Sequence, residues 1–134
     1  MKRNIREIFK LNLTAAILFT LLSVAIAEAA QVNNFRLKFP KGKSSTAQTR
    51  SIKAGGIHDI FFRARKGQRV SVKITSADGA AQFNLGAMNE FDVDPIKDNT
   101  QSYTGKLPFA GTGEYVIRVE SEQTTRYTLS VSIQ

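Results

Sequence analysis

Hydrophobic and polar residues alternate along most of the chain after residue 30. The alternation is strictest in RYTLSVSI (126–133), and it recurs in NFRLKF (34–39), RVSVKI (69–74) and EYVIRV (114–119). Side chains of a β-strand point alternately to its two faces, so a period of two marks a strand with one face in a core and one in water. The pattern therefore predicts four strands that each bury one apolar face.

Four weaker candidates for strands are AQTRSI (47–52), HDIFFRA (58–64), AQFNLG (81–86) and QSYTGKL (101–107). Glycine-containing turns such as KAGG, SADGA and AGTG separate the candidate strands. Many short strands with turns between them, and no helical period, are typical of a two-layered all-β domain. We predict an antiparallel β-sandwich of about eight strands, with a small β-barrel as the alternative.

The segment MNEFDVDPIKDNTQ (88–101) does not follow this alternation. Pro95 lacks a backbone N–H, so it cannot complete the hydrogen-bond ladder of a central strand. We therefore predict an irregular crossover between the two sheets in this segment.

The first 29 residues have the layout of a secretory signal peptide. A basic start, MKRNIREIFK, is followed by a run of fifteen mostly apolar residues (13–27) and then by small residues. An uncleaved membrane anchor is the alternative, but a membrane-spanning helix needs about 20 apolar residues. The small residues allow cleavage after Ala27 or after Ala29, and we favour Ala29. Residues 1–29 are then the signal peptide, and residues 30–134 form a single β-sandwich domain.

The chain contains no cysteine. This excludes a cysteine nucleophile, a thiolate metal site and a lipid-modified thiol. A domain of about 105 residues buries roughly two-thirds of its unfolded surface, which is enough for a core without covalent cross-links. We expect a soluble periplasmic or secreted protein that has no membrane attachment once the signal peptide is removed.

Positive charge is concentrated in the first half of the expected domain. Residues 31–77 contain eleven Lys and Arg against one acid, whereas residues 78–134 contain four against eight. A strongly basic half suggests an acidic partner surface or an anionic polymer. The alternative is a solvated face whose charge only favours solubility.

No set of residues in the sequence predicts an enzyme. His58 is the only histidine, and a hydrolytic triad needs a histidine beside both a nucleophile and an orienting acid. In a strand, Asp59 points to the face opposite His58, so we expect His58 to be a partly exposed surface residue without a catalytic role. We predict a protein that is not an enzyme and needs no cofactor.

The segment 88–101 contains four acids close together, which are Glu90, Asp92, Asp94 and Asp98. Carboxylate oxygens at this spacing are compatible with Ca²⁺, but the segment lacks the glycine and the terminal glutamate of an EF-hand loop. We expect an acidic surface loop and no metal site, with Ca²⁺ binding as the alternative.

Aromatic and basic residues are mixed in IHDIFFRARKGQR (57–69), as they are in surfaces that bind nucleic acid. Because Phe61 and Phe62 are adjacent, a strand directs one of them into the core, where it cannot stack on a base. Export also removes most settings in which a protein meets nucleic acid. We therefore expect no nucleic-acid partner.

Several segments together resemble one group of exported bacterial domains. They are FPKGKSS (39–45), ARKGQRVSVKI (64–74), the Y-x-G-x-LP pattern (103–108), GTGEYVIRV (111–119) and the terminal RYTLSVSI (126–133). The chain resembles the pre-peptidase C-terminal-like β-sandwiches and, within them, the bacterial periplasmic inhibitors of g-type lysozyme. The resemblance covers nearly the whole expected domain.

The resemblance implies a small exported protein that blocks the active-site cleft of a g-type lysozyme with loops and so protects bacterial peptidoglycan. Periplasmic lysozyme inhibitors share a loop of the Ser-Gly-x-Tyr type, and Thr112-Gly113-Glu114-Tyr115 matches it with Thr in place of Ser. The retained hydroxyl suits a hydrogen bond to a catalytic carboxyl group. The implied contact residues are Thr112, Gly113, Glu114, Tyr115, Arg118 and Arg126, accompanied by a basic surface of Arg63, Arg65, Lys66 and Arg69.

Tyr115 also has an interpretation that needs no partner. Sandwich domains often bury a tyrosine near the start of a strand, with its hydroxyl group bonded to the backbone. We therefore expect Tyr115 to support the loop, and Thr112 and Gly113 at the tip to make the contact.

A second class of function stays open beside lysozyme inhibition. The basic residues also suit a noncatalytic module that binds the cell wall or another polysaccharide, with peptidoglycan as the candidate partner. Attraction of this kind weakens as salt screens the charges.

Overall fold

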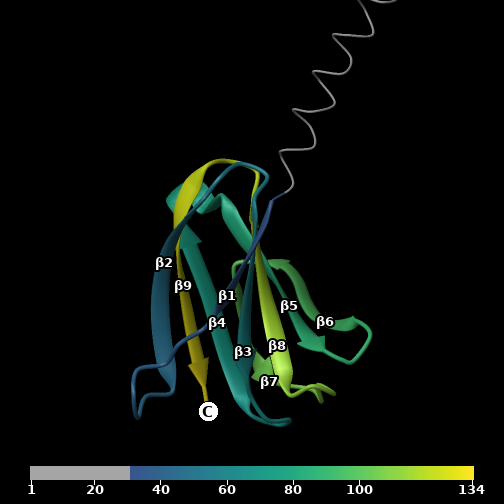
Figure 1. The fold of residues 1–134 in the computed structure, drawn as a ribbon. Helices are drawn as coiled ribbons and strands as arrows, with labels where there is room; N and C mark the ends of the chain where they lie inside the picture. Colours follow the sequence, from purple (N-terminus) through teal and green to yellow (C-terminus); the bar gives the residue numbers. More distant parts are fainter. Residues whose placement is uncertain (1–30) are drawn as a thin grey trace, which may run out of the picture. The chain divides into compact units, whose positions relative to one another are not determined.

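The computed structural model describes residues 31–134, and the predicted signal peptide lies outside the described residues. Nine strands form two sheets that pack face to face, as Figure 1 shows. No helix in this part of the chain is long and apolar enough to cross a membrane. The strands are β1 (Val32–Arg36), β2 (Ser45–Ile52), β3 (Ile57–Arg63), β4 (Arg69–Ser76), β5 (Ala81–Met88), β6 (Val93–Thr100), β7 (Ser102–Lys106), β8 (Glu114–Ser121) and β9 (Thr125–Ile133), with a 3₁₀ turn, η1 (Ala77–Gly79), after β4.

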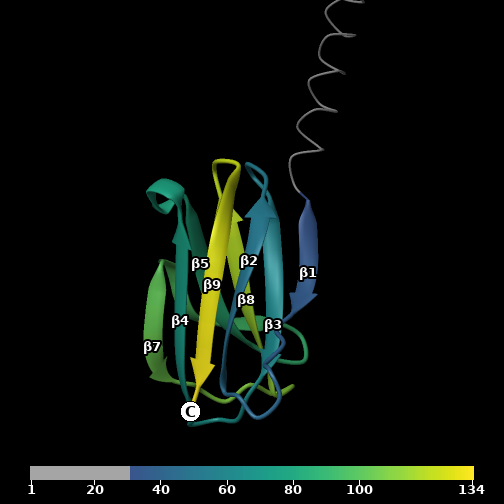
Figure 2. The ribbon, with the colours of Figure 1, turned by 90° about the vertical axis from the view of Figure 1, so that its left-hand side faces the viewer.

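Sheet A has the strand order β1-β3-β8-β5-β6, and sheet B has the order β2-β9-β4-β7. In Figure 2, sheet B faces the viewer. The two separate sheets confirm the predicted sandwich over the barrel. The strong patterns at 69–74, 114–119 and 126–133 correspond to β4, β8 and β9, and the weaker candidates correspond to β2, β3, β5 and β7.

One strand pair departs from the predicted antiparallel arrangement, since β1 pairs with β3 in parallel. After β1 the chain crosses to sheet B and returns along β2, so β3 enters sheet A in the direction that β1 had. The alternation predicted over 34–39 holds, because Leu37 is buried and Phe35 and Phe39 are half-buried. Regular pairing nevertheless ends at Arg36.

The prediction of an irregular segment at 88–101 is wrong for its second part, which forms β6. This strand lies at the edge of sheet A and pairs only with β5, and two register shifts interrupt the pairing. An edge strand tolerates Pro95 because one side of its ladder has no partner to receive an N–H. The chain does change sheets here as predicted, since β6 belongs to sheet A and β7 to sheet B.

The core lies between the sheets and is formed by the inward face of each strand. Ile60, Phe62, Val72, Ile117 and Leu129 are each 2 % exposed or less. Complete burial of a side chain of this size stabilises a protein by roughly 1.5–3 kcal/mol. In β4, β8 and β9, where the alternation is strong, the period of two therefore identified the inward side chains correctly.

The expectation that His58 is partly exposed is wrong. Its side chain is 5 % exposed and points into the core, where Nδ1 lies 2.7 Å from the hydroxyl oxygen of Tyr127. The ring of Phe35 packs edge-on against the imidazole, with 5.1 Å between ring centroids. The pattern within β3 could not show this, because β1 and β9 supply the groups that cover His58. Asp59 points to the other face, as predicted.

We predict that His58 makes the processed protein less stable at mildly acidic pH. Burial, followed by the positive charge of Arg50, lowers the pKa of His58 from its ordinary value of 6.5. Below that value the unfolded chain binds a proton that the folded protein does not, so the free energy of unfolding falls as the pH drops from about 6.5 toward the lowered pKa. Chemical denaturation at about pH 7.5 and about pH 5.5 measures this fall.

The matched control is His58→Gln, which removes the only imidazole of the chain. Whatever its absolute stability, this variant should lose less free energy of unfolding between the two pH values than the wild type. An equal loss in both proteins would show that His58 does not cause the pH dependence.

Candidate functional site

The loop 107–113, which precedes β8, is joined by backbone hydrogen bonds to the loop 64–68. The N–H of Leu107 donates to the carbonyl oxygen of Gln68 at 2.8 Å, and the N–H of Gly67 donates to the carbonyl oxygen of Leu107 at 2.9 Å. Leu107 is itself buried in the core. The two loops therefore have fixed positions relative to each other and to the sandwich.

On its other side, the same loop is joined to the turn between β5 and β6. The N–H of Gly111 donates to Oδ1 of Asn89 at 2.8 Å, and the N–H of Thr112 donates to the carbonyl oxygen of Met88 at 3.2 Å. Three segments that are far apart in sequence thus form one surface. We call the surface made by loops 64–68, 89–92 and 107–113 the loop end.

Tyr115 supports the loop 107–113 from below, as predicted. Its side chain is 1 % exposed and stacks on Phe62, with 5.5 Å between ring centroids. Its hydroxyl group donates to the carbonyl oxygen of Pro108 at 2.5 Å, and burial raises the pKa of this phenol. Gly113 has φ 74°, in the left-handed region that favours glycine. Because the Tyr115 side chain is buried in this way, it does not reach the surface of the loop end.

The hydroxyl group of Thr112 is engaged within the protein. Its Oγ1 donates to the carbonyl oxygen of Met88 at 2.8 Å and accepts the N–H of Glu114 at 3.2 Å. The single hydroxyl proton is therefore already used. In this structure Thr112 holds the loop against the end of β5, which the sequence pattern alone did not show.

Glu114 holds two arginine side chains beside the loop. Nη2 of Arg36 lies 2.6 and 2.8 Å from the two carboxylate oxygens of Glu114, and Nη1 of Arg63 lies 3.4 Å from one of them. The carboxylate is only 15 % exposed, so its charge is largely compensated by these neighbours. Glu114 thereby links β1, β3 and β8 at the loop end.

Two phenylalanine side chains project from the loop end into solvent. Phe91 is 93 % exposed and Phe109 is 64 % exposed. Large aromatic side chains exposed on neighbouring loops are common in surfaces that bind a partner. Neither was predicted from the sequence, although each lies outside the alternating stretches, where nothing predicts burial for an aromatic residue.

Arg63, Arg65 and Lys66 bring positive charge to the loop end. Nη2 of Arg63 lies 3.4 Å from the carbonyl oxygen of Thr112, and Arg65 and Lys66 are exposed in the next loop. The structure thus places most of the predicted basic surface beside the predicted contact loop. The fourth member, Arg69, begins β4 and points outward from sheet B.

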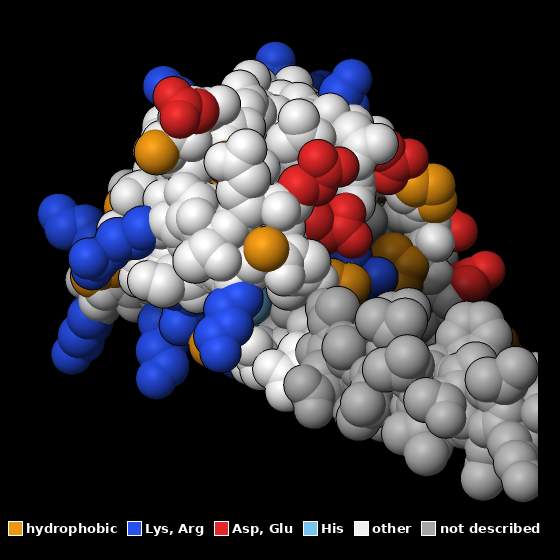
Figure 3. Space-filling view, turned by 90° about the horizontal axis from the view of Figure 1, so that it is seen from above, with side chains coloured by type: hydrophobic (Ala, Val, Ile, Leu, Met, Phe, Trp, Pro, Cys, Tyr) orange, Lys and Arg blue, Asp and Glu red, His pale blue; other side chains and the backbone are white. Residues whose placement is uncertain are grey.

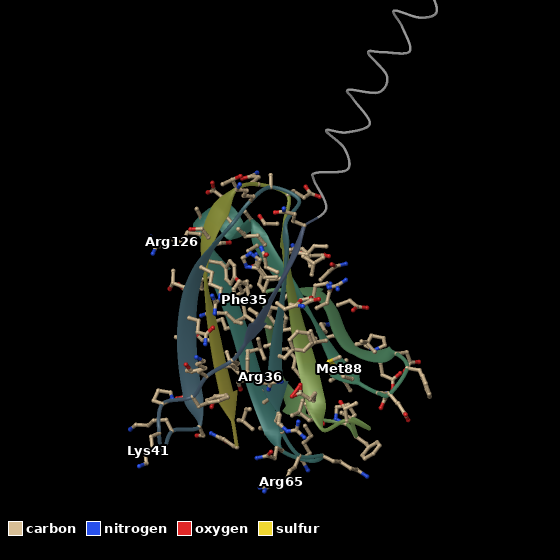
Figure 4. All side chains as sticks on the ribbon, in the orientation of Figure 1. Phe35, Arg36, Lys41, Arg65, Met88 and Arg126 are labelled. Carbon is tan, nitrogen blue, oxygen red and sulfur yellow. The ribbon has the colours of Figure 1, made fainter. Side chains whose placement is uncertain are left out.

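Arg118 and Arg126 lie away from the loop end. Arg118 is in the middle of β8 on the outer face of sheet A, where Nε and Nη2 donate to the two carboxylate oxygens of Asp59 at 2.8 Å each. This hydrogen bonding raises the pKa of Arg118. Arg126 is near the start of β9, opposite Ser51, and Figure 4 shows it at the other end of the sandwich from Arg65. The two arginines are therefore not neighbours of Thr112.

The acidic segment does not assemble a metal site. Among residues 31–134, no group of three or more His, Asp or Glu side chains is placed to hold a metal ion. Asp94 instead accepts a hydrogen bond from Nδ2 of Asn89, and the N–H of Asn89 donates to the carbonyl oxygen of Asp92 at 2.9 Å. These contacts shape the turn that displays Phe91.

Solved structures of periplasmic lysozyme inhibitors share this fold. Aeromonas hydrophila PliG, a periplasmic lysozyme inhibitor of g-type lysozyme, aligns with a TM-score of 0.68 and 24 % identity over 78 % of this chain and 99 % of its own. A mutant of PliG-Ec from Escherichia coli aligns with a TM-score of 0.59, 24 % identity and coverage of 76 % and 98 %. Salmonella Typhimurium PliG aligns with a TM-score of 0.59 and 23 % identity over 76 % of this chain and 98 % of its own. All three are described as inhibitors of g-type lysozyme.

At the level of the fold, these matches confirm the resemblance to periplasmic inhibitors of g-type lysozyme that the sequence predicted. A pre-peptidase C-terminal domain of collagenase from Bacillus anthracis aligns more weakly, with a TM-score of 0.42 and 16 % identity. No protein-family model matches the chain, and no curated protein matches it significantly in sequence.

We predict that the Thr112 hydroxyl group stabilises the loop in the free protein. Thr112→Val removes both bonds of Oγ1 and keeps the size of the side chain, so it should lower the free energy of unfolding by roughly 1 kcal/mol. It should also accelerate amide exchange at Glu114, whose N–H loses its acceptor. Thr112→Ser keeps the hydroxyl group and should resemble the wild type. Exchange at the Glu114 amide, followed by NMR, would refute this role if it were equal in the valine and serine variants.

Proposed function

We propose that the processed protein is a periplasmic inhibitor that binds a g-type lysozyme and blocks its active-site cleft with the loop end. The single observation that carries the proposal is the fold shared with three proteins described as inhibitors of g-type lysozyme, over nearly their whole length. Export directed by residues 1–29, followed by their removal, would deliver the protein to the compartment that contains peptidoglycan.

The form of the loop end supports this proposal. A glycoside hydrolase holds its glycan in a cleft and cuts it with carboxyl groups, so its blocker needs a projecting surface that tolerates acids. Loops on a rigid scaffold provide such a surface. Hydrogen bonds fix loop 107–113 on both sides before any partner arrives. Docking then costs less conformational entropy than it would for a loose loop.

The exposed side chains of the loop end supply the attraction. Phe109 offers an aromatic anchor of the kind that often dominates an interface. Arg65 and Lys66 offer positive charge, and no carboxylate within residues 31–134 forms a salt bridge with either of them. Arginine is suited to pair with a carboxylate in the cleft through two hydrogen bonds.

The predicted contact residues in and beside the loop 107–113 fall into two groups according to their place in the structure. Thr112, Gly113 and Glu114 define the shape of the loop and lie beside the partner, whereas Tyr115 supports the loop from the core. We therefore propose that binding comes from Phe109, Arg65 and Lys66, with Phe91 at the margin of the contact. Arg118 and Arg126 are not included in the proposed contact.

We predict that loop-end variants weaken inhibition. Phe109→Ala should raise the protein concentration needed for half-inhibition of a g-type lysozyme by about tenfold, because truncating an aromatic anchor costs on the order of 1–2 kcal/mol. Arg65→Gln should raise it by a smaller factor that shrinks as salt is added. Turbidity loss of a cell-wall suspension measures the lysozyme activity.

Arg126→Gln is the matched control, because it removes one exposed arginine from the opposite end of the sandwich. It should inhibit as well as the wild type. If the folded wild-type protein leaves g-type lysozyme fully active at micromolar concentration, inhibition is not its function. If it inhibits but Phe109→Ala and Arg65→Gln match the wild type, the loop end is not the contact.

A further inference from the structure

Charge is divided between the two sheets. The four strands of sheet B contain five basic residues and no acid, whereas the five strands of sheet A contain five acids and four basic residues. In Figure 3, many lysine and arginine side chains project on the side where Figure 1 draws β2 and β9, and most acidic side chains lie toward the other side. The basic residues of sheet B are Arg50, Arg69, Lys73, Lys106 and Arg126.

Four of these five basic side chains lie on the outer face of sheet B. Arg69, Lys73, Lys106 and Arg126 are exposed and alternate with inward residues of their strands. Arg50 points inward instead, and its guanidinium carbon lies 3.7 Å from the centre of the Phe35 ring. None of the four outward residues forms a salt bridge with a carboxylate of residues 31–134.

Small hydroxyl side chains occupy most other positions of this outer face. They line up across the strands because neighbouring strands are in register. Figure 2 shows the order of these four strands in sheet B. Hydrogen bonds link Thr49 to Thr128 at 2.9 Å and Ser71 to Thr104 at 3.2 Å. One row contains Ser45, Ser132, Ser71 and Thr104, and the next contains Ala47, Ser130, Lys73 and Ser102.

These short side chains leave a shallow trough of about 530 Å³ on the face of sheet B. Serine and threonine from all four strands line the trough, and Lys73 is its one charged residue. The outer face carries no large exposed hydrophobic side chain, since those of residues 31–134 are Val32, Phe91, Val93 and Phe109. The surface therefore carries hydroxyl groups and positive charge and exposes no large apolar side chain.

We propose that the outer face of sheet B binds an anionic glycan strand. Sugar hydroxyl groups need partners that both donate and accept hydrogen bonds, and serine and threonine hydroxyl groups do both. Acidic groups on the glycan meet a face that has basic residues and no acid. Neighbouring strands lie about 4.8 Å apart, so the hydroxyl groups repeat across the sheet. A polymer that lies across the strands would meet them at regular intervals.

Other anionic partners fit this face less well. Single-stranded nucleic acid is usually held by aromatic side chains that stack on the bases, and the outward positions of β2, β4, β7 and β9 contain none. A membrane surface usually receives apolar side chains as well as charge, and this face exposes none of large size. The combination of hydroxyl groups and cations favours a charged saccharide.

This binding would be separate from lysozyme inhibition and does not depend on it. The trough lies on one face of the sandwich, whereas the loop end lies at one end. Different residues form the two surfaces, so a glycan on sheet B would hold the protein at the cell wall whether or not the loop end binds lysozyme.

Sedimentation with purified peptidoglycan sacculi, whose glycan strands carry peptides with free carboxyl groups, tests the proposal. The wild-type protein should co-sediment at low salt and be released at about 0.5 M salt, where the screening length is only a few ångströms. The double variant Lys73→Gln/Arg126→Gln should bind about fourfold more weakly, given a factor of about two for each exposed charge. Sacculi whose carboxyl groups have been amidated should retain much less protein.

A second pair of variants tests the trough itself. Ser130→Glu places an acid among the hydroxyl groups and should abolish retention, whereas Ser130→Gln has the same size without the charge and should retain at least part of it. Thermal unfolding should show that both remain folded, because position 130 is exposed. Equal retention of the two variants would overturn the proposal.

The double variant Arg65→Gln/Lys66→Gln removes two charges from the loop end and should bind sacculi like the wild type. A loss equal to that of Lys73→Gln/Arg126→Gln would show that net charge, and not sheet B, causes retention. No retention of the wild type at low salt, or retention that resists 0.5 M salt, would also overturn the proposal. Because Lys73→Gln/Arg126→Gln leaves the loop end unchanged, it should still inhibit lysozyme acting on soluble glycan fragments, so failure of one function can be distinguished from failure of the other.

Discussion

The burial of one face of every core strand between the two sheets is the constraint on which this structure depends. The chain has no cysteine, so apolar packing must supply the free energy that a disulfide often adds to a small exported domain. Side chains such as Ile60, Ile117 and Leu129 are fully buried and are not available for binding. Partners can therefore reach only the outer faces and the turns at either end.

The two proposed surfaces use these remaining positions in different ways. At the loop end, the buried Tyr115 holds the loop against the core through the hydrogen bond from its hydroxyl group to the carbonyl oxygen of Pro108. Thr112 and Glu114 fix the sides of the loop. On sheet B, the outward half of each strand needs no special geometry, because regular pairing already aligns Ser71 and Ser132. One surface depends on irregular backbone, and the other depends on regular repetition.

Local alternation was sufficient to predict most of the strands. In β4, β8 and β9, for example, the alternating apolar residues of the strand itself show which face is buried. Alternation could not predict the parallel pairing of β1 or the strand β6. The first depends on the sheet to which the intervening β2 belongs, and the second depends on an edge position that makes Pro95 harmless. His58 was misjudged for a similar reason, because the groups that bury it come from distant strands.

The candidate site was predictable from the sequence at positions where the residue type alone determines the structural role. Gly113 and Tyr115 behave as their types suggest, with a positive φ and a buried ring. The role of the Thr112 hydroxyl depended on Met88, and the display of Phe91 and Phe109 depended on which loops become neighbours. Arg118 and Arg126 are close to Tyr115 in sequence, yet strand direction and the hairpin after β8 carry Arg126 to the other end.

The central claim is that the loop end docks into the cleft of a g-type lysozyme, and amide hydrogen exchange of the complex tests it most directly. We predict slower exchange in loops 64–68 and 107–113 when g-type lysozyme is bound, with exchange in β2 and β9 unchanged. Slower exchange confined to sheet B or to the turns near Arg126, with the loop end unaffected, would contradict the account.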